Sequence, residues 1–304
     1  MNVDPKEIVR ALSAILSPGQ VTELRALEAT TANYGKPRTI FGYFDDPAKL
    51  AAALKGIGSA KGIYFTPNPV TPALLARAQN RLKDAGKSET TSDKDITRRR
   101  WLLIDCDAVR PAGISASAAE HKAALDCAQN IRADLAERGW PDPIMADSGN
   151  GAHLLYAVDL PADDGGLIER CLDALADQHG GDTVVVDRSV HNPARIWKLY
   201  GTMAAKGDST VERPHRMARI IELPANMATV THAQLEELAS QAPVKESPKT
   251  KPINGHAPTG DRFAWLDAFL TRNADKLPPM TRPGPYEGGR RWEFEYCPWN
   301  PSEH

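Results

Sequence analysis

Residues Trp101 to Leu223 carry an order of elements that constrains the fold more than any other feature of this sequence. The apolar run WLLIDCD predicts a strand, residues 118–138 have the spacing of a helix, and PIMADSGNGAHLLYAV predicts a hairpin. A helix in DGGLIERCLDALADQHG, a strand in TVVVDRSV and a last strand in MARIIEL follow. The resulting β-α-β-β-α-β order indicates an α+β fold of the ferredoxin-like, or RNA-recognition-like, type.

The preceding segment predicts a smaller α/β module. A helix from Pro5 to Leu16 has Asp4 as its cap, because a carboxylate accepts from the free N–H groups of a first helical turn. Strands are expected in VTELRAL, RTIFGYF and GIYFTPNPV, and further helices in DPAKLAAAL and TPALLARAQNRL. We expect this module to pack against the central fold.

Four parts follow from this reading of the chain. The N-terminal module spans residues 1–95, the central domain 96–230, a helix with a linker 231–262, and a C-terminal segment 263–304. The linker is assigned to QAPVKESPKTKPINGHAPTG, which is rich in Pro, Lys and Gly.

The composition excludes a membrane-spanning protein and a generally basic one. No apolar run approaches the length that crosses a bilayer, and the N-terminus lacks the pattern of a secretory signal. The four cysteines are scattered, which favours a reducing compartment, so we expect a cytoplasmic protein without a membrane partner. The formal net charge is −2, so nucleic-acid binding would have to come from a local basic patch.

Asp105 and Asp107 close the first strand of the central fold. Side chains two apart in a strand project to the same face, so these carboxylates lie side by side while Ile104 and Cys106 face the other way. Adjacent carboxylates repel each other, and a hard cation such as Mg²⁺ or Mn²⁺ removes that repulsion. Asp187 ends the strand VVVD, and if the two strands are neighbours, three carboxylates converge at a site for two divalent metals. A D-x-D at a strand end can also simply begin a loop, and the residues alone leave that alternative open.

The turn of the predicted hairpin adds a second element. Ser148 and Gly149 begin a glycine-containing turn, whose backbone N–H groups can hold phosphate oxygens. His153 stands at the start of the following strand and could donate to a phosphate or a sugar hydroxyl. The alternative is an ordinary hairpin turn followed by a packed histidine.

The third element is basic. Residues 181–219 carry seven Lys or Arg and four Asp or Glu, in a chain that is slightly acidic overall. Arg195 and Lys198 flank a tryptophan, and Lys206 follows; such side chains can pair with phosphates. A solvated charged face is the alternative. A second basic cluster lies just before the D-x-D strand and consists of Arg98, Arg99 and Arg100.

Four motifs in this order resemble the archaeo-eukaryotic primase superfamily, and within it the primase-polymerase domains of phages, plasmids and mobile elements. The motifs are the D-x-D in LLIDCD, the turn and strand in DSGNGAHLLY, the later aspartate in VVVDRSV, and the N-x-x-R-x-x-K-x-x-G-T stretch in NPARIWKLYGT. The resemblance covers residues 24–224.

This resemblance implies a replication enzyme that joins nucleotides on a single-stranded DNA template by a two-metal mechanism, on an RRM-like catalytic palm. The residues implied to hold two Mg²⁺ or Mn²⁺ ions are Asp105, Asp107 and Asp187. Those implied to contact the incoming dNTP or NTP are Ser148, Gly149, His153, Arg195 and Lys198. Template contacts are expected from Arg98, Arg99, Arg100 and Lys206, and a lining of the cleft from Tyr64, Thr66 and Asn68.

The C-terminal segment contains half of a possible zinc site. Cys297 and His304 have C-x6-H spacing, but a tetrahedral site needs a second pair, so zinc is not expected here. In relatives of this kind such a segment looks like the start of a Cys/His-rich region before a helicase. We therefore expect a truncated chain, with a helicase domain as a candidate partner in a longer protein.

Two other functions remain open at this stage. One is a catalytically silent nucleic-acid-binding module, for which the three carboxylates and the histidine would have no use. The other is a metal-dependent nuclease that uses the same aspartates, against which the order of the motifs argues.

Overall fold

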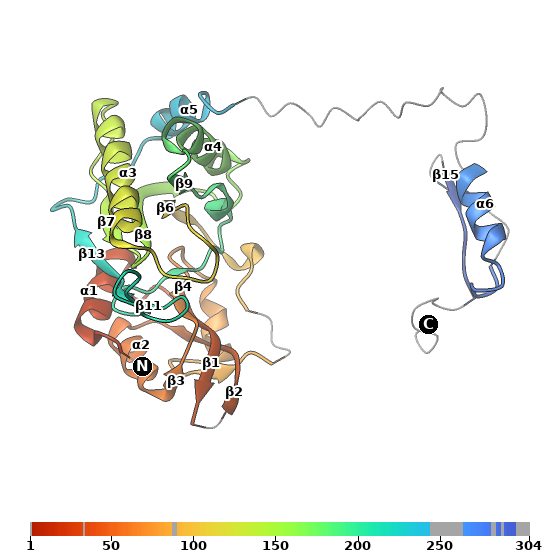
Figure 1. Ribbon diagram of the computed structural model, residues 1–304, viewed down its shortest axis with the longest axis horizontal. Coiled ribbons are helices and arrows are strands. Elements are labelled where there is room, and N and C mark those ends of the chain that lie inside the picture. Colours follow the sequence, from red (N-terminus) through yellow and green to blue (C-terminus); the bar gives the residue numbers. More distant parts are fainter. Residues whose placement is uncertain are drawn as a thin grey trace. The chain divides into compact units, whose positions relative to one another are not determined.

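The computed structural model describes residues 2–32, 34–86, 90–243, 264–280, 284–286 and 289–295. They belong to two units, Met1–Val244 and Lys245–His304, each of which is described by itself (Figure 1). Among the described residues no helix is long and apolar enough to cross a membrane.

A five-stranded antiparallel sheet forms the centre of the first unit. Its spatial order is β13-β7-β8-β6-β9, so β6 lies between β8 and β9. Along the chain the elements run β6-α3-β7-β8-α4-β9, which is the predicted order, and β13 adds a strand at the β7 edge. The fold is therefore α+β, as predicted. The strands are β6 (Arg99–Ala108), β7 (Ile144–Asp147), β8 (Gly151–Leu160), β9 (Val184–Val186) and β13 (Arg219–Glu222).

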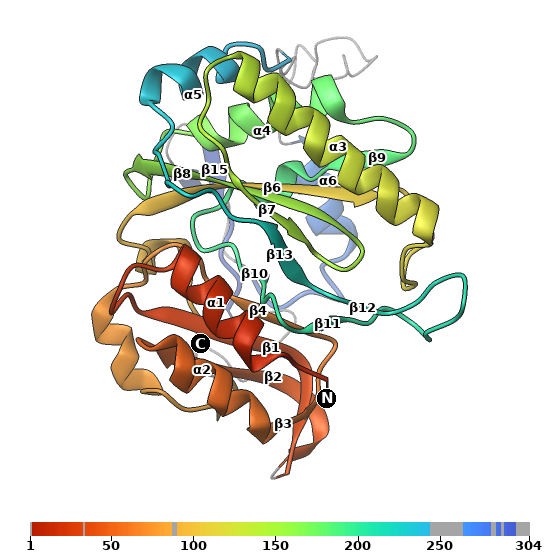
Figure 2. The ribbon, with the colours of Figure 1, turned by 90° about the vertical axis from the view of Figure 1, so that its left-hand side faces the viewer.

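Helices cover one face of this sheet. Figure 2 shows α3 (Ala118–Glu137) and α4 (Leu167–His179) above the strands, with α5 (His232–Ala239) against α4. Leu102, Ile104 and Cys106 of β6 are fully buried on this side, as their spacing predicts. The start of α3 is fixed by a capping box, in which Ser117 and Glu120 satisfy each other's backbone N–H groups.

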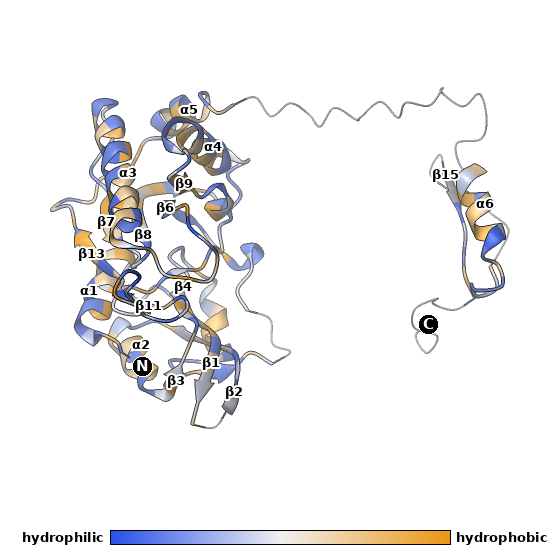
Figure 3. Cartoon of the chain, in the orientation of Figure 1, coloured by the Kyte–Doolittle hydropathy of each residue, from blue (hydrophilic) through white to orange (hydrophobic). Residues whose placement is uncertain are grey.

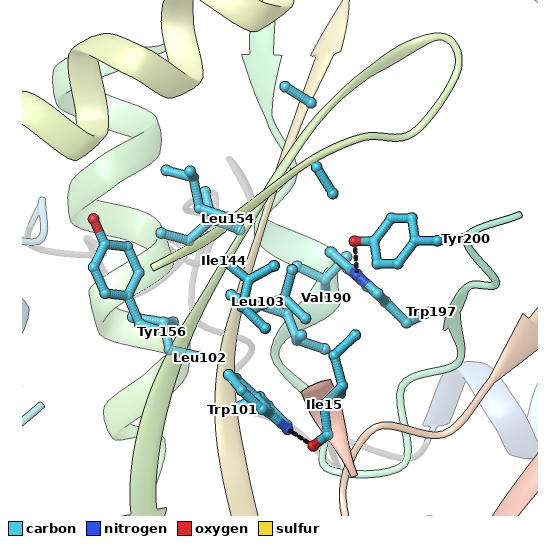
Figure 4. Close-up of a cluster of buried hydrophobic side chains, with 14 of the residues drawn as sticks. Ile15, Trp101, Leu102, Leu103, Ile144, Leu154, Tyr156, Val190, Trp197 and Tyr200 are labelled. Carbon is cyan, nitrogen blue, oxygen red and sulfur yellow. Dashed lines mark hydrogen bonds between the residues drawn. The ribbon is translucent and has the colours of Figure 1, made fainter. Parts of the chain in front are cut away.

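The opposite face of the sheet is covered over only part of its length. The Trp101 indole of β6 donates to the backbone oxygen of Ile15, at the end of α1 (Pro5–Ile15), and Leu103 is buried next along the strand (Figure 4). Asp105 and Asp107 follow on the same face, and their side chains remain 24% and 42% exposed. The two carboxylates therefore emerge where the apolar cover ends.

A second sheet belongs to the N-terminal part of the same unit and has the order β10-β4-β1-β2-β5, with β3 also paired to β1. Its last strand, β10 (Trp197–Lys198), comes from the region after Asp187 and pairs with β4, so the chain returns to this sheet. The other elements of this layer are β1 (Thr22–Thr31), β2 (Tyr34–Phe44), α2 (Pro47–Ala53), β3 (Ile57–Ser59), β4 (Gly62–Phe65) and β5 (Lys83–Asp84).

Helix α1 forms as its sequence pattern predicts. The Asp4 carboxylate accepts from the N–H groups of Lys6 and Glu7, and Ile8 and Leu12 are fully buried. Figure 3 shows hydrophobic and hydrophilic residues alternating along the helices of the first unit, as expected where one side of a helix packs on a sheet.

The helix predicted in TPALLARAQNRL is wrong beyond its first turn and a half. Only a 3-10 helix forms, from Pro72 to Arg77. The Ala78 oxygen then accepts from the Tyr43 N–H, and the Asn80 N–H donates to the Tyr43 oxygen. Asn80 adopts a φ of 49°, which breaks a helix. Backbone bonds to the neighbouring β2 therefore override the helical propensity of this segment.

Among the described residues, one short β-ribbon and three more 3-10 turns complete the first unit. β11 (Met203–Ala204) and β12 (Arg216–Met217) form a hairpin after β10, and Asp187 caps a 3-10 turn over Arg188–His191. Two further 3-10 turns lie at Leu54–Gly56 and Asp93–Asp95.

The second unit contains α6 (Ala264–Arg272) and the strand pair β14 (Gly284–Tyr286) and β15 (Gly289–Arg291). Cys297 and His304 lie outside the described residues, and so does the predicted linker from Val244 to residue 262.

Candidate active site

A cleft opens between the two layers of the first unit at the exposed end of β6. Tyr64 and Lys61 line it from the N-terminal layer. Eight of the residues singled out from the sequence also line this cleft: Asp105, Asp107, Ser148, His153, Asp187, Arg195, Lys198 and Lys206. Segments that are far apart in the sequence therefore meet at one place.

The three carboxylates come together through strand pairing. β6 and β9 are antiparallel with Cys106 opposite Val186, and the Asp187 backbone N–H donates to the backbone oxygen of Asp105 at 2.9 Å. In the structure two of these side chains are held by protein partners. Asp107 accepts from Arg110 at 3.2 Å, and Asp187 accepts from the Ser189 N–H at 2.8 Å.

Asp105 has the most perturbed electrostatics of the three. Burial, followed by the negative charges of Asp107 and Asp187, raises the pKa of Asp105 to about 8. A carboxylate in these surroundings is uncharged at neutral pH unless a cation compensates its neighbours. Within the described residues no three His, Cys, Asp or Glu side chains stand at metal-ligand spacing. Asp107 and Asp187 would have to rotate away from their present partners to complete such a site.

The residues nevertheless suit a hard divalent cation. All three are oxygen donors, which Mg²⁺ and Mn²⁺ prefer; Asp105 and Asp107 lie on β6, and Asp187 directly follows the neighbouring strand β9. Burial and the repulsion by Asp107 and Asp187 together raise the pKa of Asp105, and a bound cation would offset both.

His153 stands beside Asp105 because β8 pairs with β6 in that register. Its Nε2 lies 3.5 Å from Asp105 Oδ1, and its Nδ1 lies 2.8 Å from the Tyr200 hydroxyl. The ring is buried and rests against Trp197, with ring centroids 4.1 Å apart. Burial lowers the pKa of His153 to about 3, so the imidazole is neutral at physiological pH.

The Ser148–Gly151 turn is internally bonded rather than open. The Gly149 N–H donates to Asp147, the Gly151 N–H donates to the Ser148 hydroxyl, and the Ser148 N–H donates to the Gly151 oxygen. Three N–H groups expected to face a phosphate are therefore used within the protein. The turn positions its neighbours: Gly149 has a φ of +92°, and a Cβ there would stand 2.5 Å from the Ala204 methyl.

Gly151 brings β8 unusually close to the carboxylates. A Cβ at this position would stand 2.2 Å from the Cys106 oxygen and 3.0 Å from Asp107 Oδ1. Gly151 closes the predicted turn and begins a strand, and a glycine at such a place is a sequence signal for a close backbone approach.

Lys198 is the most buried cation of the cleft. It lies on β10 opposite Tyr64, its Nζ donates to the Met203 oxygen at 2.8 Å, and burial lowers its pKa to about 8. Arg195 donates to the Ser189 backbone oxygen and hydroxyl.

The cluster before the D-x-D strand lies at the other end of β6. Arg98 and Arg100 both pair with Asp159, and Arg99 forms a buried ion pair with Asp164 at 2.8 Å. None of the three lines the cleft that holds Asp105. Of the N-terminal residues expected there, Tyr64 lines the cleft, whereas Thr66 and Asn68 are buried, with Asn68 bonded to Pro193 and Arg100.

Comparisons with known proteins give likeness in structure alone. No family model matches the sequence, and no curated protein matches it. The AEP domain of the cyanophage S-2L primase-polymerase is similar over 80% of this chain and 100% of that chain, with 15% identity and a TM-score of 0.41.

Two primase structures are similar to the same extent. The primase RepB′ matches over 78% of this chain and 62% of that chain, at 12% identity and a TM-score of 0.42. The catalytic domain of primase RepB′ in complex with initiator DNA matches over 78% and 94%, at 13% identity and a TM-score of 0.38. The three solved structures are primases or a primase-polymerase, the kind of protein that the motifs resemble.

Proposed function

We propose that this chain is the catalytic part of a primase-polymerase, which joins nucleotides on a single-stranded DNA template. The observation that carries the proposal is the convergence of Asp105, Asp107 and Asp187 on two paired strands beside a cleft lined by Arg195 and Lys198. Carboxylates for metals and cations for phosphates are the two requirements of phosphoryl transfer.

The proposed site holds two Mg²⁺ or Mn²⁺ ions, with Asp105, Asp107 and Asp187 as their ligands. When bound, the ions would activate a 3′-hydroxyl and stabilise the pyrophosphate leaving group. The rotation would break the ion pair of Asp107 with Arg110 and the hydrogen bond by which Asp187 caps the turn at Arg188–His191, so metal binding has to offset both losses.

The cations of the cleft bind and orient the nucleotide in this proposal. Lys198 and Arg195 attract the triphosphate, and Lys206 also lines the cleft, where it can hold a phosphate of either strand. His153 presents an uncharged ring beside Asp105, so it can donate a hydrogen bond without adding positive charge next to the metals.

In the same proposal the central sheet is a catalytic palm of the RRM-like kind. Its helices α3 and α4 cover one face, and the carboxylates stand on the other, toward the N-terminal layer. The incoming dNTP or NTP would enter between the two layers. A helicase domain would act beside this part in a longer protein.

The test is extension of a primed single-stranded DNA template with dNTPs or NTPs in the presence of Mg²⁺ or Mn²⁺. The test variant carries Asp105→Ala and Asp107→Ala, and the matched control is Asp126→Ala, an exposed aspartate of α3 paired with Lys122. We expect template-dependent product from the wild type and the control but none from the double variant. Product that persists in the double variant would refute the site, and degradation of the template without extension would indicate a nuclease instead.

A further inference from the structure

A short chain of buried hydrogen bonds leads from Trp197 to His153. The Trp197 indole nitrogen lies 2.9 Å from the Tyr200 hydroxyl, which lies 2.8 Å from His153 Nδ1 (the first contact is drawn in Figure 4). All three residues are at most 4% exposed. The other ring nitrogen of His153, Nε2, faces Asp105 at 3.5 Å.

The direction of these hydrogen bonds follows from the chemistry of the three groups. An indole N–H can only donate, so the Tyr200 oxygen accepts from Trp197. The hydroxyl has one hydrogen of its own, and among the described residues its two partners are Trp197 and His153. That hydrogen is satisfied only if it is donated to His153 Nδ1.

The opposite arrangement would leave a buried donor without a partner. If Nδ1 carried a proton, the Tyr200 oxygen would accept two hydrogen bonds, and its own hydrogen would point into the core unpaired. Nδ1 is therefore the acceptor, and the proton of the neutral imidazole sits on Nε2, the atom that faces Asp105.

We infer that Tyr200 is a positioning residue of the proposed active site, whose hydroxyl fixes His153 as an Nε2–H donor aimed at the Asp105 end of the cleft. Trp197 supports this in two ways: its N–H orients the Tyr200 hydroxyl, and its ring packs against the imidazole at 4.1 Å. The donor then faces the Asp105 carboxylate at 3.5 Å, where it would support that carboxylate once a metal is bound, as residues behind a metal ligand commonly do.

The role of Tyr200 in catalysis rests on the proposed function, whereas the tautomer of His153 does not depend on it. The tautomer can be measured in the whole protein without any substrate, by NMR of the imidazole nitrogens after labelling histidine with ¹⁵N. The chain has eight histidines, so the His153 signals are assigned by their loss in a His153→Gln variant. We expect a protonated Nε2 and an unprotonated Nδ1 in the wild type. A proton on Nδ1 would overturn the inference.

The variant Tyr200→Phe tests the role of the hydroxyl. We expect the Nδ1–H tautomer to appear in its spectrum and kcat for primer extension to fall roughly 10- to 100-fold, the usual cost of losing a partner behind a metal ligand. The matched control is Tyr156→Phe, because Tyr156 is as buried as Tyr200 and lies on β8 with His153, but its hydroxyl has no partner among the described residues. The control should keep both the tautomer and kcat.

The outcomes separate the two claims. The positioning role would be overturned if Tyr200→Phe kept the wild-type tautomer of His153 and had the same kcat as the Tyr156→Phe control. If the wild type extends no primer with any metal or template, the proposed function fails, and the spectrum still decides the tautomer. If Tyr200→Phe does not fold, as judged by its thermal unfolding against Tyr156→Phe, the wild-type spectrum alone decides.

Discussion

Binding of a divalent metal to this protein should release a proton from Asp105. Burial and the charges of Asp107 and Asp187 raise the pKa of Asp105 to about 8, so the carboxyl is mostly protonated at neutral pH before the metal arrives. A metal ligand has to be ionised, and binding therefore expels the proton. The number of protons released measures how strongly burial and the two neighbouring carboxylates together raise the pKa of Asp105.

The size of the effect follows from this pKa. With a pKa of about 8, Asp105 is about 0.9 protonated at pH 7 and about 0.1 protonated at pH 9. Binding of Mg²⁺ or Mn²⁺ should release about 0.9 proton at pH 7 and about 0.1 at pH 9. Below pH 8 the apparent affinity should weaken about tenfold for each pH unit.

Titration calorimetry in buffers with different ionisation enthalpies counts these protons, since the observed heat varies linearly with the buffer's enthalpy. Lys198 is another group of the cleft with a pKa of about 8, so an Asp105→Asn variant is needed to assign the proton. That variant should release almost none, and Asp126→Asn should behave as the wild type. Asp107→Asn should release less than the wild type, because it removes the larger of the two repelling charges. Metal binding at pH 7 without proton release, or release that persists in Asp105→Asn, would refute the reasoning.

Three further predictions concern stability. Without metal, Asp105→Asn should be more stable than the wild type, as measured by urea denaturation. The pKa of Asp105 is raised in the folded state, so the wild type loses stability as pH rises. The difference in unfolding free energy should therefore grow by up to about 1.4 kcal/mol per pH unit between about pH 4 and 8. Gly151→Ala should lower the free energy of unfolding by about 1–3 kcal/mol and reduce activity, because the added Cβ would force β8 away from β6. Gly181 has open space around it, so Gly181→Ala should lower the free energy of unfolding much less in the same urea series. Glu120→Gln should lower the melting temperature above about pH 4.5 but not near pH 2. The hydrogen bonds from Arg213 lower the pKa of Glu120 to about 2, and their contribution to stability is lost as pH falls through that value. An equal loss of melting temperature at both pH values would contradict this assignment.

The order of the central elements could be predicted from the sequence because each one has a clear local signal. β6 is an apolar run ended by two aspartates, and α3 has a capping box and a regular apolar stripe. The side-by-side placement of Asp105 and Asp107 needs only the two-residue period of a strand. Asp187 meets these two carboxylates only if the strand before it lies next to β6. The sequence left that open, and the pairing of β6 with β9 satisfies it.

What the sequence did not predict depends on contacts between distant segments. The short turn after Pro72 is held by backbone bonds to Tyr43, and these bonds have no local signal. The same is true of β10, whose two residues join the N-terminal sheet although they follow the central fold in sequence. This crossing brings Lys198 and Trp197 into the cleft.

The internal bonding of the Ser148–Gly151 turn was also beyond the sequence. A turn of this composition can open its N–H groups to an anion or close them on itself, and Asp147 decides this by accepting from the Gly149 N–H. Tyr200 was overlooked for a similar reason. It follows Lys198 by two residues, but only the folded chain brings its hydroxyl to His153.

The central claim is that Asp105, Asp107 and Asp187 together hold two divalent cations. Anomalous diffraction from crystals of the protein grown with Mn²⁺ and a non-hydrolysable dNTP tests it most directly. We predict two manganese peaks among the three carboxylates, with Asp107 turned away from Arg110 and Asp187 turned away from the Ser189 N–H. Ordered nucleotide in the cleft without manganese beside Asp105, or manganese bound only elsewhere, would contradict the claim.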